Sequence, residues 1–151
     1  MSKKYEKYFV IVLAVLLTTL ILVPARTPAW AMEDQPHLMV SVDVKPGSYP
    51  NAINISSPGK VPVALYGGMD FDVSQVDIST VKLHPMDRPD AGAPVLRYAY
   101  EDLNGDGYLD IIFKFKSTEI GLTSADSEVC LHGDLMDGTH FCGHDTVKVI
   151  G

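Results

Sequence analysis

Residues 38–45 read Leu-Met-Val-Ser-Val-Asp-Val-Lys, and this stretch decides the class of fold. Its apolar side chains stand at every second residue: Leu38, Val40, Val42 and Val44. Successive side chains of a strand point to opposite faces, so this alternation predicts a strand with one buried face. Pro46 and Gly47 then end the strand, because both residues favour turns.

The rest of the chain continues in short pieces of this kind, separated by turns rich in Pro, Gly and Asn. Further strands are predicted at residues 61–66, 81–83, 95–100, 111–115, 128–135 and 146–150. Asp137-Gly138, between the last two, is typical of a hairpin turn. After residue 32, no segment keeps a helical period of apolar residues for three turns. About seven strands at this spacing predict an all-β, immunoglobulin-like antiparallel β-sandwich over residues 38–151.

Residues 102–110 read Asp-Leu-Asn-Gly-Asp-Gly-Tyr-Leu-Asp and carry oxygen side chains at alternate positions. Ca²⁺ takes about 6–8 oxygen ligands, and alternate residues of a tight loop converge on one centre. Gly107 stands where a loop of this type turns sharply. The pattern predicts one calcium ion, held by the side chains of Asp102, Asn104, Asp106 and Asp110 and by the Tyr108 carbonyl.

The loop departs from the helix-loop-helix calcium motif at its twelfth position, where Phe113 replaces the bidentate Glu. The β-branched and aromatic run that follows, at residues 111–115, indicates a strand instead of a helix. The loop therefore resembles the nine-residue kind found between strands in secreted modules, in which Asp110 would complete the set of ligands. The alternative is a hairpin turn rich in Asn, Gly and Asp that binds no metal.

The N-terminus has the pattern of a secretory signal peptide. Three lysines precede an apolar run over residues 9–23, and Ala29-Trp30-Ala31 has the small-residue form of a cleavage site. We expect residues 1–31 to be removed and residues 32–37 to form a flexible tail on a protein that is extracellular, periplasmic or at the cell surface. No stable membrane anchor is expected, because a span needs about 20 apolar residues. An uncleaved anchor is the alternative.

Removal of the signal peptide would make the protein strongly acidic. The whole chain has 12 basic and 19 acidic residues and a formal charge of −7. Residues 1–31 hold four of the basic and one of the acidic residues, which leaves 8 and 18 and a charge of −10. Nucleic acid is therefore not an expected partner, because its binding needs clustered Lys and Arg. Calcium, neutral glycans and cell-surface proteins remain possible partners.

The two cysteines, Cys130 and Cys142, are predicted to form a disulfide, because an even number of cysteines in an exported protein favours pairing. The chain-entropy model gives a bridge over so short a loop about 2–3 kcal/mol. Unpaired thiols are one alternative. The other is a transition-metal site, because residues at even spacing on strands share a face. That site would use Cys130, His132, His140, Cys142 and His144.

Motifs spread over residues 40–150 are similar to those of one secreted bacterial module. They are Val42 to Ser48, Pro50 to Asn54, Gly59 to Leu65, Phe71-Asp72, Val76-Asp77, Thr80-Val81, Glu101 to Gly107 and Asp137 to Val147. Together they resemble a little-characterised extracellular β-sandwich domain family with a calcium loop, in which Cys142 falls at a variable position. The resemblance implies a fold and a compartment, and it implies no reaction.

The sequence favours a non-catalytic protein. No serine lies in a G-x-S-x-G motif, and no pair of histidines forms H-E-x-x-H. We therefore expect a calcium-stabilised module that acts in extracellular adhesion or as a structural subunit, with self-assembly through edge strands. The alternatives are a carbohydrate-binding module, a small hydrolase with a pair of carboxylates, and a protein that binds a transition metal through Cys and His.

Overall fold

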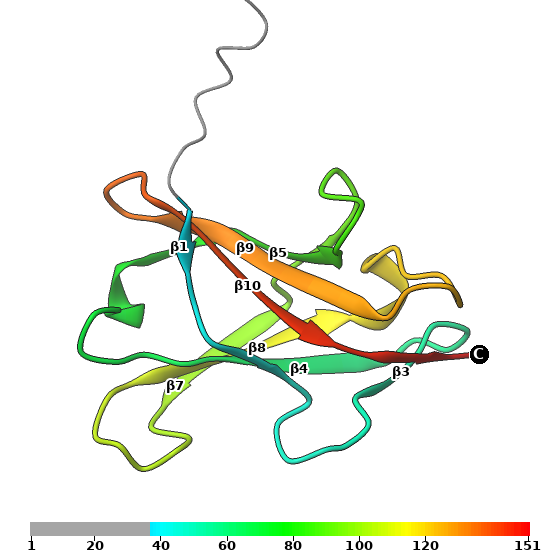
Figure 1. Ribbon diagram of the computed structural model, residues 1–151, viewed down its shortest axis with the longest axis horizontal. Coiled ribbons are helices and arrows are strands. Elements are labelled where there is room, and N and C mark those ends of the chain that lie inside the picture. Colours follow the sequence, from blue (N-terminus) through cyan, green and yellow to red (C-terminus); the bar gives the residue numbers. More distant parts are fainter. Residues whose placement is uncertain (1–36) are drawn as a thin grey trace, which may run out of the picture. The chain divides into compact units, whose positions relative to one another are not determined.

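A computed structural model describes residues 37–151. The predicted signal peptide and residues 32–36 of the predicted tail lie outside the described residues. The described part is an all-β sandwich, which confirms the predicted class (Figure 1). Within it, helix is limited to two 3-10 turns, Val73–Gln75 and Ser117–Glu119.

Two main sheets form the sandwich. The first has five strands in the order β1-β10-β9-β5-β6, with bounds Leu38–Met39, His140–Thr146, Glu128–Leu135, Val76–Pro85 and Ala93–Pro94. The second has four strands in the order β2-β4-β8-β7, with bounds Val42–Val44, Lys60–Leu65, Asp110–Lys116 and Arg97–Glu101. A separate parallel pair joins β11 (Lys148–Ile150) to β3 (Ala52–Asn54).

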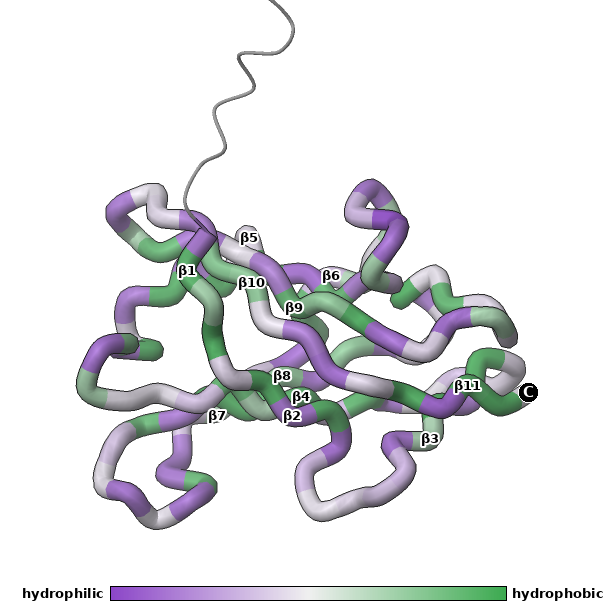
Figure 2. The backbone as a smooth tube through the Cα atoms, in the orientation of Figure 1, coloured by the Kyte–Doolittle hydropathy of each residue, from purple (hydrophilic) through white to green (hydrophobic). Residues whose placement is uncertain are grey.

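The hydrophobic core lies between the two sheets. Each strand directs alternate side chains inward, so the core is built from residues at a spacing of two. The five-stranded sheet supplies Leu83, Leu131 and Phe141, and the four-stranded sheet supplies Val63, Phe113 and Phe115, all at most 1% exposed. Figure 2 shows hydrophobic residues recurring along the strands, with hydrophilic residues frequent in the loops. Full burial of one such side chain contributes about 1.5–3 kcal/mol.

The stretch predicted as one strand at residues 38–45 is two strands in different sheets. β1 pairs in parallel with β10, Leu38 opposite Phe141, whereas β2 pairs antiparallel with β4. The chain crosses from one layer to the other between Met39 and Val42. Leu38, Val42 and Val44 still pack against the shared core, but from two sheets instead of one.

Residues 37–151 form eleven strands instead of about seven, because several are only two or three residues long. The main omission of the sequence prediction is β10. The turn at Asp137-Gly138 is confirmed, with Gly138 at a φ of 86° and its N–H donating to the Leu135 carbonyl. The strand after this turn begins at His140, however, and not at residue 146.

Candidate metal sites

The predicted calcium loop connects β7 to β8 at one end of the four-stranded sheet (Figure 1). Gly105 and Gly107 have φ values of 76° and 88°, in the region that favours glycine, so the sharp turn predicted at Gly107 is present. These two residues let the chain fold back on itself within a few residues. The side chains of the loop can then bond to its own backbone.

The carboxylate of Asp102 is the centre of these bonds. Its Oδ1 accepts the N–H of Gly105 at 2.7 Å and that of Asp106 at 3.2 Å, and its Oδ2 accepts the N–H of Gly107 at 3.0 Å. Asn104 Oδ1 accepts the Asp106 N–H at 3.0 Å. The loop is therefore wound around its oxygen side chains, which fixes their direction through backbone N–H groups.

Asp110 connects the two ends of the loop to each other and to the neighbouring segment at Gly67. It is fully buried, and its two carboxylate oxygens accept different backbone N–H groups: Gly67 at 2.9 Å and Leu103 at 2.8 Å. These bonds join the first residue of β8 to the start of the loop and to the segment that follows β4. Glu101, the last residue of β7, lies directly opposite Asp110 in the strand register. Two acidic residues opposite each other repel, and a cation nearby would relieve this repulsion.

A different part of the molecule holds the most compact group of potential metal ligands. Among residues 37–151, one set of three or more His, Cys, Asp or Glu side chains has ligand atoms all within 4.8 Å of one another: His84, Cys130 and His132. The carboxylates of the calcium loop are spread more widely than this. Calcium binding there stays a prediction.

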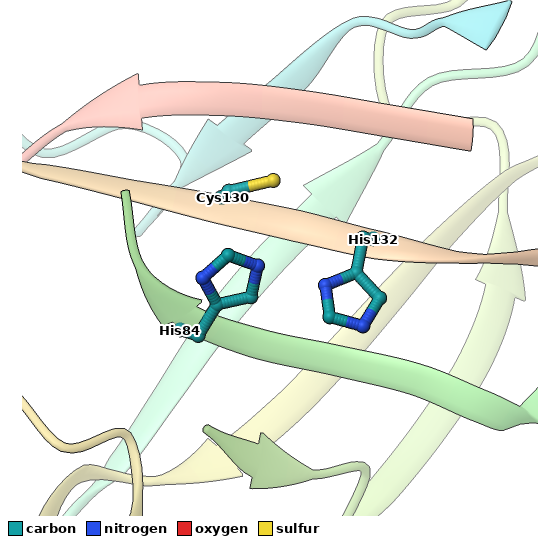
Figure 3. Close-up of side chains that lie close together, drawn as sticks. All are labelled: His84, Cys130 and His132. Carbon is teal, nitrogen blue, oxygen red and sulfur yellow. The ribbon is translucent and has the colours of Figure 1, made fainter. Parts of the chain in front are cut away.

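The cluster of His84, Cys130 and His132 lies on the face of the five-stranded sheet that points away from the core. β5 supplies His84, and the neighbouring β9 supplies the other two (Figure 3). Cys130 is opposite His84 in the register, and His132 is two residues further along the same face. The two imidazole rings lie next to each other, tilted by 53° with centroids 4.7 Å apart, and the Cys130 thiol lies beside them (Figure 3).

The ring of His84 has a fixed tautomer. Its Nδ1 lies 2.7 Å from the carbonyl oxygen of Pro85, in a buried environment. A carbonyl can only accept, so in the neutral form of the ring Nδ1 carries the proton and Nε2 has the free lone pair. A bond of this kind is common behind metal-binding histidines, because it orients the ring and raises the basicity of the other nitrogen.

Burial favours the neutral forms of the other two side chains. It lowers the pKa of His132, and the neighbouring charges of His84 and Lys82 lower this pKa further. Burial also raises the pKa of the Cys130 thiol, together with a hydrogen bond to Cys142. His132 is therefore a neutral imidazole at neutral pH, which is the form that binds metals, whereas Cys130 must lose a proton first.

The structure gathers part of the predicted transition-metal set and adds one residue to it. Cys130 and His132 come together as predicted, and His84 joins them from a strand that the sequence prediction did not pair with β9. His144 is exposed opposite Cys130, and His140 bonds to Asp134 instead, with its ring 6.1 Å from that of His37. The sequence did contain an indication for His84. Val81 and Leu83 alternate toward the core, so His84, the next residue on the strand, points to the opposite face.

The cysteines are free thiols in this structure. Cys130 is opposite His144 and Cys142 is opposite His132, so the two cysteines are diagonal neighbours on adjacent strands. Diagonal neighbours stand about 7–8 Å apart, whereas bridged cysteines usually have Cα atoms about 4.4–6.8 Å apart. A bridge would therefore need a small movement of β10 toward β9, and the predicted disulfide stays a prediction.

Mass spectrometry of the protein exported by its host tests the disulfide. We expect the intact mass under non-reducing conditions to be 2 Da below that of the dithiol, because a bond forms with the loss of two hydrogens. Alkylation before reduction should then label neither cysteine. Two labelled thiols on correctly folded protein would show that the pair stays reduced outside the cell.

A third feature is the exposed edge of β7, the strand that leads into the calcium loop. β8 is its single neighbour in the sheet, and all five of its residues are exposed. Tyr98 and Tyr100 form an edge-to-face pair with ring centroids 5.9 Å apart. Beside them lies an open depression lined by Ile78 and by residues 94–98.

No helix in residues 37–151 is both long enough and apolar enough to cross a membrane. Comparison of the chain with protein-family models, with curated proteins and with solved structures gave no match.

Proposed function

We propose that this protein is a secreted, non-catalytic structural module that assembles with copies of itself through the edge of β7, in a conformation that calcium orders. The observation that supports the proposal best is the self-complementary sequence of that edge. Among the described strands at sheet edges β7 is the longest, with five residues, whereas β1 and β6 have two. An exposed strand with unpaired N–H and C=O groups is a template for pairing with another chain.

The residues of β7 match one another when two copies pair antiparallel around Ala99. Arg97 of one copy then stands opposite Glu101 of the other, and Tyr98 stands opposite Tyr100. Opposite charges and aromatic pairs at such positions each contribute about 0.2–1 kcal/mol relative to alanine pairs. The pairing would extend the four-stranded sheet of each copy into one sheet of eight strands.

Calcium would act on this edge through the loop. The loop begins directly after Glu101 and ends at Asp110, which stands opposite it. An ion held by Asp102, Asn104, Asp106, Asp110 and the Tyr108 carbonyl would neutralise part of this negative charge and fix the end of β7. An edge that is ordered before contact loses less conformational entropy on binding.

Sedimentation with and without calcium tests the assembly. We expect dimers in calcium and monomers in excess chelator. Arg97→Glu should prevent dimers, because it places Glu opposite Glu, and the double variant Arg97→Glu, Glu101→Arg should restore them. Both side chains are exposed, so neither change should affect folding. Monomers under all conditions, or a double variant that fails while remaining folded, would contradict the proposal.

Calorimetry tests the calcium site itself. Wild-type protein should bind one ion, and Asp106→Ala should bind at least about tenfold more weakly, because it removes a charged ligand from an exposed position. Lys116→Ala, an exposed change on the same sheet, serves as the control and should bind as wild type does. Equal heats from wild type and Asp106→Ala would exclude the loop as the site.

A second candidate function is the binding of neutral glycans at the tyrosine pair. The exposed faces of Tyr98 and Tyr100 and the depression beside them support it, because sugar rings pack against aromatic side chains. Tyr98→Ala would abolish such binding, which a panel of immobilised glycans measures. Glu101→Arg lies outside this depression and places Arg opposite Arg in the paired edge, so it would prevent dimers and leave glycan binding unchanged. This difference separates the two functions.

A further inference from the structure

The outer face of the five-stranded sheet carries chemistry that the calcium loop does not use. Two rows of side chains cross it in register: His84, Cys130 and His144 in one row, and Lys82, His132 and Cys142 in the next. Nitrogen and sulfur donors of this kind bind Zn²⁺ and similar cations, whereas Ca²⁺ requires oxygen. We propose that His84, Cys130 and His132 form a zinc site that is independent of the calcium loop.

The spacing of the three donors is close to what zinc requires. A tetrahedral ion with bonds of about 2.0–2.1 Å to nitrogen and 2.3 Å to sulfur places its ligand atoms about 3.3–3.6 Å apart. The three donor atoms here already lie within 4.8 Å of one another. The donor atoms must therefore approach one another by at most about 1.5 Å, a change that small side-chain rotations can supply.

The site is preorganised at His84, one of its two buried ligands. His84 is 4% exposed, and the bond from its Nδ1 to the Pro85 carbonyl leaves Nε2 free. Its ring cannot serve as a hydrogen-bonded surface histidine, because it is buried and its remaining nitrogen faces the other two donors (Figure 3). Gly92 packs against the same residue: a Cβ there would lie 2.9 Å from the His84 Cβ. The chain at Gly92 therefore passes directly beside the base of the His84 side chain.

The surroundings favour zinc over a purely structural role for these side chains. Cys130 is also only 4% exposed, whereas His132 is partly exposed and gives the ion access from solvent. Neither histidine of the cluster hydrogen bonds to the buried Cys130 thiol, so no hydrogen bond within the cluster accounts for the arrangement. As a zinc ligand the same sulfur would be a deprotonated thiolate with a strong partner.

Cys142 connects the site to the oxidation state of the protein. Its side chain contributes to the raised pKa of the Cys130 thiol, and it stands opposite His132 on the same face of the sheet, so it is a candidate for a fourth ligand. A Cys130–Cys142 disulfide would take the thiolate away from the metal. Zinc and the disulfide therefore compete for the same sulfur, and only the reduced protein can bind the ion through it.

Cobalt titration of the purified protein tests this inference. The fully reduced protein is freed of metal and titrated with Co²⁺ in excess calcium, so that the calcium loop is saturated. We expect one Co²⁺ per chain, with visible absorption typical of tetrahedral coordination and a near-ultraviolet band from thiolate to cobalt. One equivalent of Zn²⁺ should bleach both bands. No binding tighter than about 0.1 mM, or binding without the thiolate band, would overturn the assignment.

Variants identify the ligands. Cys130→Ser should remove at least about half of the thiolate band, because Cys142 is the one other thiol that could bind the ion. His132→Gln should weaken Zn²⁺ binding by about 100-fold or more, a loss at least as large as that for changes in the groups that orient metal ligands. His144→Ala and His140→Ala are matched controls, exposed on the same face and outside the cluster, and should bind as wild type does. If instead His144→Ala and His140→Ala lose the ion, the cluster is wrong.

Two measurements on the wild-type protein avoid variants that fail to fold. Zinc should slow alkylation of the buried Cys130 at least tenfold, and chelation should reverse this protection. Protein oxidised to the Cys130–Cys142 disulfide, verified by mass, should lose the cobalt spectrum. An unchanged alkylation rate, or unchanged zinc affinity after oxidation, would show that the Cys130 sulfur is not a ligand.

Discussion

Gly67→Ala should destabilise the protein by at least about 3 kcal/mol, at the upper end of the range for overpacking. A Cβ at this position would lie 2.1 Å from the carbonyl oxygen of Leu109. The obstacle is backbone, so no side-chain rotation can relieve it. The segment after β4 or the end of the calcium loop must move, and the bond from the Gly67 N–H to Asp110 is lost with it.

Thermal unfolding measures this effect, which should lower the Tm by on the order of 10 °C. Gly68→Ala is the matched control, because nothing lies within 4 Å of a Cβ at that position. Its Tm should stay within about 2 °C of the wild-type value. Equal Tm values for the two variants would show that the approach of Gly67 to Leu109 has no energetic importance.

Asp110→Ala should cost about 2–6 kcal/mol in the absence of calcium. The carboxylate is the partner of the Gly67 and Leu103 N–H groups, and each buried donor left without a partner costs about 1–3 kcal/mol. Asp110→Asn should cost less, because its amide oxygen can still accept one of the two bonds. Urea denaturation of the three proteins in chelator measures these differences.

Asp106→Ala provides the contrast to Asp110→Ala. Asp106 is exposed and accepts the Tyr108 N–H within the loop, so its removal should change stability in chelator by less than about 1 kcal/mol. In saturating calcium the wild type should gain about 2.7 kcal/mol at 100 times its dissociation constant, and Asp106→Ala should gain much less. If the Asp106 and Asp110 variants were equally unstable in chelator, the bonds from Asp110 to the Gly67 and Leu103 N–H groups would not be important for stability.

The sequence was sufficient for the class of fold because its strand signals are local. Alternation at residues 38–45 and the β-branched run after the calcium loop each place apolar residues at a spacing of two. β10 was not predicted because Phe141-Cys142-Gly143-His144 contains no β-branched residue. It forms a strand because it pairs with β9 over seven residues. The sequence of one strand does not reveal which other strand it pairs with.

The same reason explains which site residues could be predicted. The ligands of the calcium loop lie within nine consecutive residues, so their spacing is visible in the sequence. His84 is 46 residues from Cys130, and only the register between β5 and β9 places the two side chains opposite each other. Likewise, the two bonds made by Asp110 could not be predicted, because one of them joins it to Gly67 across the sheet.

The parallel pairing of the first and last strands has a mechanical consequence. β1 runs parallel to β10 and β11 runs parallel to β3, so tension applied between the two ends of the sandwich pulls each of these strands along its partner. The hydrogen bonds of each pair are then loaded together in shear, instead of opening one after another as they do when antiparallel strands are peeled apart. A module tethered at both ends would therefore resist stretching at the two places where force enters it.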